Sequence, residues 1–329
     1  RQQQPPLPAS RAEVQLDGQW ATTIRGEPFV LHQSDAMVIF TTIDNLKILA
    51  SCSCVFMDGT FKVCPSLFSQ LYSVHAMYRD HFVPLIYCLL PSKQRDTYYD
   101  MLSIIKREMS YHNLVWSPTK IYTDFEAALI PTIRSHFPST THKGCYFHFT
   151  QAIWRQVQSL GLSTDYNSND DMKKIIRMLM ATAYFPVVCV RPAIDLLESS
   201  DQVTGNPALR RLFEYFRSTW LSSFPPAMWN VYSEAIRTNN HVEGWHHRLN
   251  RAIGKIHPNI FQFVTCLKSE QSETELTIQR ARVGEAPPPR RKKYRQLDER
   301  LERLRALFQA GELDVQEYLA SVRHIVHHY

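Results

Sequence analysis

The pattern of apolar and polar positions between residues 53 and 91 predicts a sheet, with alternation at 68–78 and a run at 82–91 that is apolar throughout. Three runs rich in β-branched and aromatic residues are separated by short polar turns, and "RDH" at 79–81 predicts a tight turn between the second and third. These runs predict an antiparallel meander of the strands 53–58, 68–78 and 82–90. Upstream of it, "DAMVIFTT" at 35–42 predicts a strand or short buried segment, and 43–52 has helical spacing.

After the meander, amphipathic helical patterns alternate with short apolar runs. They predict a helix at 94–112, a strand at 120–124, a helix at 125–137, a strand at 142–147 and a helix at 148–162. The resulting order, β-β-β-α-β-α-β-α, is that of the ribonuclease-H fold. We therefore predict an α/β fold with a mixed five-stranded sheet in the order 3-2-1-4-5.

Residues 165–236 show only helical patterns and predict an all-helical insertion with its own core. Helical spacing places six large apolar side chains in that core: Leu179, Phe185, Leu197, Phe213, Phe216 and Trp220. A helix then resumes at 243–253, and charged helices at 295–310 and 314–328 form a C-terminal extension. The predicted divisions are a linker at 1–34, a first core part at 35–164, the insertion at 165–236, completion of the core at 237–285, and a basic linker with C-terminal helices at 286–329.

Composition and charge are typical of a globular domain and give no sign of a membrane-spanning segment. Hydrophobic residues make up 44% of the chain and charged residues 21%, as in globular domains, and no apolar run reaches the roughly 18 residues of a membrane span. The net charge is +6, of which residues 290–305 carry +5. The seven cysteines show no disulfide framework and predict reduced, buried thiols of an intracellular protein. Because the chain begins at Arg1 with a Gln/Pro-rich lead-in, we expect a longer protein with a DNA-binding module upstream.

Two carboxylates fall at the ends of strands that the predicted sheet makes neighbours. Asp58 ends the first strand of the meander, and Asp124 ends the fourth strand. Carboxylates so close repel each other unless a cation lies between them, and Mg²⁺ prefers oxygen ligands. Glu243, in "RTNNHVEGWH" after the insertion, is the candidate third carboxylate. Such a site could hold two Mg²⁺ or Mn²⁺ ions about 3.5–4 Å apart.

The motifs "FMDGTFKVCP", "LLPSKQRDTYYDML", "IYTDFEAALI", "GCYFHFTQAIWR" and "RTNNHVEGWHHRLNRAI", followed by "HPNIFQFV", occur in an order that resembles the transposase domain of Mutator-like elements. The resemblance runs from about 35 to 285. It implies a ribonuclease-H-like enzyme with a D-D-E triad and a helical insertion before the Glu. It identifies the triad as Asp58, Asp124 and Glu243, and a C-x-x-H pair as Cys145 and His148.

Each candidate also has a structural interpretation. Asp58 before Gly59 could be a turn residue, and Asp124 a helix N-cap. Glu126 is interpreted as a solvated first-turn residue, and Glu243 could pair with Arg237 or Arg248.

The C-x-x-H pair is half of a zinc-type spacing. If the pair binds zinc, the remaining ligands would come from His241, His246, His247 or His257. The alternatives to zinc are a buried thiol beside a packed histidine and a role of His148 near the substrate. Asn239 and Asn240 would cap the helix that presents Glu243, with His241 near the site.

The resulting hypothesis is a nuclear, metal-dependent DNA transposase that cuts element ends, joins them to target DNA, and assembles as a homo-oligomer. The alternatives are a catalytically inactive, transposase-derived DNA-binding regulator and a nuclease of the same fold. "RRKK" at 290–293 is interpreted as a nuclear localisation patch or a phosphate clamp, against a solvated linker. The candidate DNA contacts are Arg237, Arg248, Arg290, Arg291, Lys292 and Lys293.

Overall fold

The computed structural model describes residues 5–238, 240–289 and 292–326. The chain folds as two compact units. Unit 1 holds the described residues up to His142 and from 240 to Pro287, and unit 2 holds Lys143–Thr238 and the described residues after Pro287. Each unit is described by itself.

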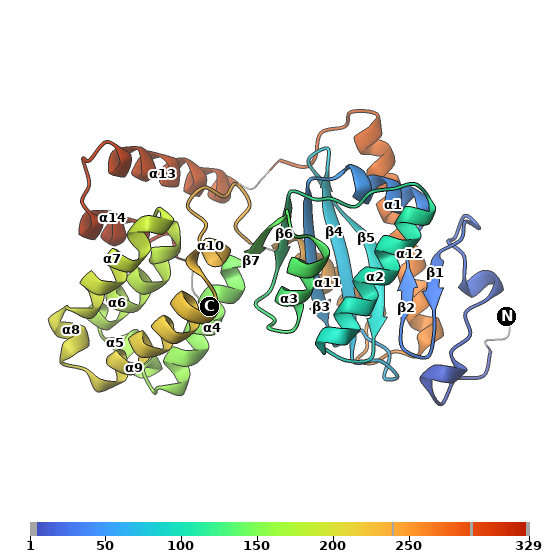
Figure 1. The fold of residues 1–329 in the computed structure, drawn as a ribbon, viewed down its shortest axis with the longest axis horizontal. Coiled ribbons are helices and arrows are strands. Elements are labelled where there is room, and N and C mark those ends of the chain that lie inside the picture. The colour runs from blue at the N-terminus through green and yellow to red at the C-terminus, as the bar shows by residue number, and fades with distance from the viewer. Residues whose placement is uncertain (1–4, 239, 290–291, 327–329) are drawn as a thin grey trace. The chain divides into compact units, whose positions relative to one another are not determined.

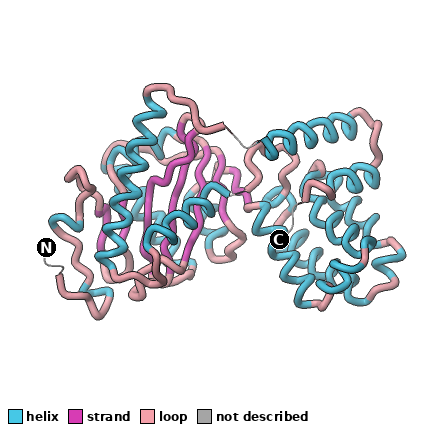
Figure 2. Tube along the Cα trace, turned by 180° about the vertical axis from the view of Figure 1, so that it is seen from behind, coloured by secondary structure: helices cyan, strands magenta, loops and turns pink. Residues whose placement is uncertain are grey.

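Unit 1 is built on a mixed seven-stranded sheet with the order β1-β2-β5-β4-β3-β6-β7 (Figures 1 and 2). β3 pairs antiparallel with β4 and parallel with β6, and β4 pairs antiparallel with β5. The strands are β1 Val30–Gln33, β2 Val38–Phe40, β3 Cys54–Thr60, β4 Gln70–Tyr78, β5 His81–Leu90, β6 Lys120–Thr123 and β7 Thr141–Gly144, the last leading into unit 2.

The predicted number of five strands was wrong, although β5-β4-β3-β6-β7 are the five predicted strands in the predicted order. The two additional strands are β2, which lies within the segment predicted at 35–42 and pairs with the outer side of β5, and β1, which pairs with β2. Together they cover the backbone groups that β5 would otherwise expose. The part of the 1–34 lead-in that follows residue 12 packs onto unit 1. Val14, Leu16 and Phe29 are buried in the core of unit 1.

The turn between β4 and β5 follows the expected hairpin. Arg79 and Asp80 have φ of 48° and 66°, so both central residues adopt the left-handed conformation. That conformation matches the right-handed twist of the flanking strands in a two-residue hairpin. This turn lies beside the start of β3, at the opposite end of the strand from Asp58, because β4 runs antiparallel to β3.

Helices cover both faces of the sheet (Figure 1). α1 Ile43–Ser51, α2 Arg95–Tyr111 and α3 Leu129–His136 enclose the core cluster on one face. α11 Asn240–Ile253 and α12 Ile260–Arg282 cover the other face, where Trp245 stacks on Tyr87 with ring centroids 5.6 Å apart. Among the described residues, none of the helices is long and apolar enough to cross a membrane.

The described part of unit 2 is helical apart from the end of β7. It contains α4 Tyr146–Ser159, α5 Ser163–Ser168, α6 Asp170–Ala181, α7 Val187–Glu198, α8 Asp201–Thr204, α9 Pro207–Phe216, the π-helical segment η4 Arg217–Ser223, α10 Pro226–Trp229, α13 Lys292–Gln309 and α14 Val315–Val322.

The six side chains predicted for the core of the insertion are all buried, which confirms that prediction. Two of them, Phe216 and Trp220, pack edge-on against Phe149, which stacks on Trp229 at 4.7 Å. The C-terminal helices belong to the same unit rather than forming a separate extension. The Tyr318 hydroxyl of α14 donates to the Tyr184 carbonyl, 3.0 Å away, and the Phe185 ring packs edge-on against Tyr318.

Candidate active site

The register of β3 and β6 brings Asp58 and Asp124 side by side. These strands are parallel neighbours, with Phe56 opposite Tyr122, and the two rings stack 4.8 Å apart. Asp58 lies two residues after Phe56 within β3, and its side chain is on the face covered by α11, where it meets His246. Asp124 follows the last residue of β6, the strand next to β3, and its charge acts on Asp58.

Asp58 is buried, with 6% of its surface exposed. Its Oδ1 accepts the Gly59 backbone N–H at 2.8 Å, and its Oδ2 lies 3.8 Å from Nδ1 of His246 on α11. Asp58 lies inside β3 and pairs with Ser73, so its interpretation as a turn residue was wrong. The Asp58 carboxylate thus accepts a hydrogen bond from its own strand and lies close to His246 of the helix that covers this face.

Glu243 lies in the first turn of α11 and belongs to the same unit as both aspartates. It precedes His246 by three residues, a spacing that puts two side chains on one face of a helix. His246 lies beside the Asp58 carboxylate, and Glu243 lies one helical turn before it on α11. The charge of Glu243 accordingly contributes to the raised pKa of Asp58.

Burial and mutual repulsion disfavour ionised carboxyls at this edge. Burial first, and then the charge of Asp124, raise the pKa of Asp58 to about 8. Burial, followed by the charge of Glu126, raises the pKa of Asp124 to about 6. Burial also raises the pKa of Glu243. Without a metal ion, Asp58 is therefore mostly protonated at neutral pH, whereas Asp124 is mostly ionised.

The donor set fits a hard divalent cation. Asp124 Oδ1 is buried and has no hydrogen-bond partner among the described residues, and the same is true of Glu243 Oε1. A cation with oxygen ligands would satisfy these oxygens and offset the repulsion within the pair. Mg²⁺ and Mn²⁺ have that preference.

A buried polar chain lies behind Asp58 and was not predicted. Ser73 Oγ lies 3.2 Å from His246 Nε2 and 2.9 Å from His75 Nε2. Burial lowers the pKa of His246 to about 4 and that of His75 well below its usual range, so both imidazoles are neutral. The three-residue spacing from Glu243 was the available signal for His246. No signal in the sequence pointed to Ser73, because its partner is 173 residues away.

Two other interpretations of acidic residues were wrong. α3 begins at Leu129 with Ala128 at its N-cap, so Asp124 does not cap it. Glu126 is not a solvated first-turn residue. It precedes the helix, accepts a hydrogen bond of 2.6 Å from the Tyr98 hydroxyl, and lies 3.5 Å from the Lys93 ammonium.

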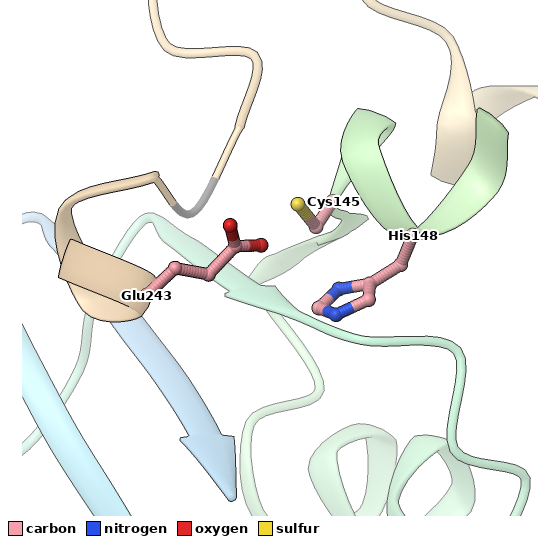
Figure 3. Close-up of side chains that lie close together, drawn as sticks. All are labelled: Cys145, His148 and Glu243. Atoms are coloured by element: carbon pink, nitrogen blue, oxygen red, sulfur yellow. The ribbon is translucent and has the colours of Figure 1, made fainter. Parts of the chain in front are cut away.

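Cys145 and His148 lie in unit 2, whereas the three carboxylates lie in unit 1. Cys145 is the N-cap residue of α4 and is buried, and His148 lies in the first turn (Figure 3). Burial lowers the pKa of His148 to about 4, so its imidazole is neutral, and its Nδ1 has no hydrogen-bond partner among the described residues. A thiol and a neutral imidazole are donors that zinc accepts, and zinc at this pair stays a prediction.

The remaining candidates are scattered. Asn240 is the first residue of α11, and His241 is exposed with its ring 5.0 Å from that of Phe82. Arg248 is exposed. Arg237 forms an ion pair with Asp298 inside unit 2, so its charge is already compensated. Lys292 and Lys293 are exposed at the start of α13, whereas Asn239, Arg290 and Arg291 lie outside the described residues.

Gly59 allows the close approach of strands beside Asp58. A Cβ at this position would lie 2.6 Å from Gln70 Oε1 and 3.3 Å from Tyr72 Cδ2. We expect Gly59→Ala to lower the free energy of unfolding by about 1 kcal/mol, because overpacking displaces the Gln70 side chain. Urea denaturation measures this. Gly244→Ala in α11 is the control, since its Cβ would meet nothing within 4 Å and the helix should be stabilised. A greater loss in the control than in Gly59→Ala would contradict the packing argument.

Residues 54–152 match the family model of the MULE transposase domain. No curated protein matches the chain. The matched segment contains Asp58 and Asp124 and ends before Glu243, so the two neighbouring strand ends lie inside the recognised domain and the third carboxylate lies beyond it. The segment from β3 into α4 is therefore similar to the MULE transposase domain, and this similarity supports a transposase-family role.

Proposed function

We propose that unit 1 is the ribonuclease-H-like catalytic core of a DDE transposase that cleaves DNA strands and transfers them during transposition. The observation that carries the proposal is the parallel pairing of β3 with β6, with Asp58 near the end of β3 and Asp124 just after the end of β6, both inside the matched segment. The strand order β5-β4-β3-β6-β7 and the helix that presents Glu243 after a helical unit support it.

In this proposal, Asp58, Asp124 and Glu243 hold two divalent metal ions against the scissile phosphate. The bound ions would activate a water or a 3′-hydroxyl and stabilise the leaving oxygen of the phosphodiester. The protein residues supply the geometry. Asp58 is oriented by the Gly59 N–H and backed by the neutral His246, so its carboxylate does not have to reorganise when the site fills.

DNA is the proposed substrate, with magnesium or manganese as the cofactor. Since transposition requires two DNA ends to be held together, we propose a homo-oligomer on DNA. We also propose that the protein acts in the nucleus, where the basic segment 290–293 would serve as the localisation signal.

The test is cleavage of DNA carrying the element's terminal sequences by the purified full-length protein. We expect cleavage and strand-transfer products in Mg²⁺ or Mn²⁺ and neither product in EDTA. Hydrolysis without joined products would favour a nuclease. A protein that binds the ends but never cuts them under either metal would instead be a transposase-derived DNA-binding regulator.

A further inference from the structure

The carboxylate edge carries an exposed aromatic ring and a lysine that the proposed metal chemistry does not use. Phe61 follows the end of β3 and Lys93 follows the end of β5. Both strand ends lie beside the start of β4, at the same edge of the sheet as Asp58. Phe61 is 43% exposed, and the Lys93 side chain is 46% exposed.

The two side chains are in contact, and buried groups anchor the lysine. Lys93 Nζ lies 4.1 Å from the centroid of the Phe61 ring and 3.5 Å from Glu126 Oε1. Glu126 in turn accepts a hydrogen bond from the Tyr98 hydroxyl, which accepts one of 2.8 Å from Gln70 Nε2. An exposed lysine normally samples many rotamers, and this chain of contacts restricts Lys93 to the edge of the site.

The ammonium is close enough to act on the catalytic carboxyls. The charge of Lys93 lowers the pKa of both Asp58 and Asp124, opposing the effect of burial. A fixed cation is unfavourable for a site whose only ligands are metal ions, because like charges repel. It is favourable where an anion also enters the site, and a DNA strand brings a phosphate on each nucleotide.

We propose that Phe61 and Lys93 form a subsite for the DNA nucleotide next to the scissile phosphate. The base stacks on the exposed part of the Phe61 ring, and the phosphate binds the Lys93 ammonium. Glu126 is a positioning residue that orients Lys93. A base can stack on a protein ring only when it has left the duplex stack, so the ligand is an unpaired segment of the strand. This inference rests on the proposed function.

Anisotropy of a fluorescein-labelled oligothymidylate, titrated with the full-length protein in Ca²⁺, tests the stacking contact. We expect Phe61→Leu to weaken binding about tenfold, the size of a lost base–aromatic stack. Binding of an abasic strand of equal length should not change, because it has no base to stack. Phe61→Trp should restore the affinity. Equal affinity of Phe61→Leu and the parent protein for the oligothymidylate would overturn the subsite.

The salt dependence of the same titration tests the phosphate contact. Lys93→Gln should reduce the slope of log affinity against log salt by about 0.7, the value for one contact to a single strand, and Lys93→Arg should retain the slope. An unchanged slope in Lys93→Gln would overturn the role of Lys93. Tyr111→Leu, at the far end of α2, and Lys47→Gln, on α1, are the matched controls, since both residues are exposed.

The binding and cleavage results distinguish an error in the subsite from an error in the proposed function. If the parent protein binds and cuts DNA while the Phe61 and Lys93 variants bind like the parent, only the subsite is wrong. If the parent binds no DNA strand, the proposed function and the subsite are both wrong. Unfolding midpoints measured alongside should agree among all variants, because both positions are exposed. A purely structural effect would lower the midpoint and would weaken binding of the oligothymidylate and of the abasic strand alike.

Discussion

Asp58→Asn, Asp124→Asn and Glu243→Gln are each expected to abolish metal-dependent cleavage, with a loss of at least about a thousandfold, the scale for removing one member of a catalytic unit. Each substitution keeps the shape of the side chain and removes the charge that offsets the metal. Folding should survive, and the metal-free variants should be as stable as the parent or slightly more so, because repulsion in the buried pair is relieved. DNA binding should persist, since it depends mainly on phosphate contacts of basic residues elsewhere.

Two controls separate loss of the site from loss of charge in general. Asp80→Asn removes a carboxylate at the opposite edge of the sheet, where the left-handed φ of 66° suits asparagine. Glu273→Gln removes an exposed carboxylate on α12. Both variants should cut end-containing DNA like the parent and melt at the same temperature. If Glu243→Gln also cuts like the parent, Glu243 is not the third ligand.

Relative to the Asp58→Asn variant, the metal-free protein is expected to lose about 2 kcal/mol of stability between pH 6.5 and pH 8, from the linkage of about 1.4 kcal/mol per pH unit for one group. Asp58 causes this difference, because its folded pKa of about 8 exceeds the ordinary value of 3.8. A carboxyl with a raised folded pKa contributes stability that is complete below the unfolded pKa and is lost as pH rises to the folded pKa. Urea unfolding in EDTA at several pH values measures it.

The comparison with Asp58→Asn removes the contributions of the other titrating groups. Asp124, with a folded pKa of about 6, has mostly titrated below this window. Burial lowers the pKa of His75, His142, His148 and His246, so these groups stabilise the fold as pH rises through the ordinary histidine value of 6.5, equally in both proteins. Mg²⁺ should remove the difference between the two profiles. Parallel profiles of the parent and Asp58→Asn in EDTA would contradict the protonated state of Asp58.

Much of unit 1 was predictable because its signals are local. Alternation of apolar and polar residues defined the central strands, and the two-residue turn at Arg79 and Asp80 follows from hairpin geometry. The positions of Asp58 and Asp124 at neighbouring strands followed from the order of elements alone. The buried residues of the helical insertion were predictable for the same reason, since helical periodicity identifies a buried face without any knowledge of its partner.

The sequence by itself determined which elements form and which acidic residues meet at a strand edge. Tertiary structure decided the rest, because those features depend on contacts between distant segments. β1 is short, had no strong pattern of its own, and is stabilised by pairing with β2, itself predicted within 35–42. His246 and Ser73 meet only when α11 packs over the sheet. Glu126 became an anchor for Lys93 only through the buried Tyr98. A residue's own neighbours in the sequence carry no information on such pairings, which arise from packing across the core.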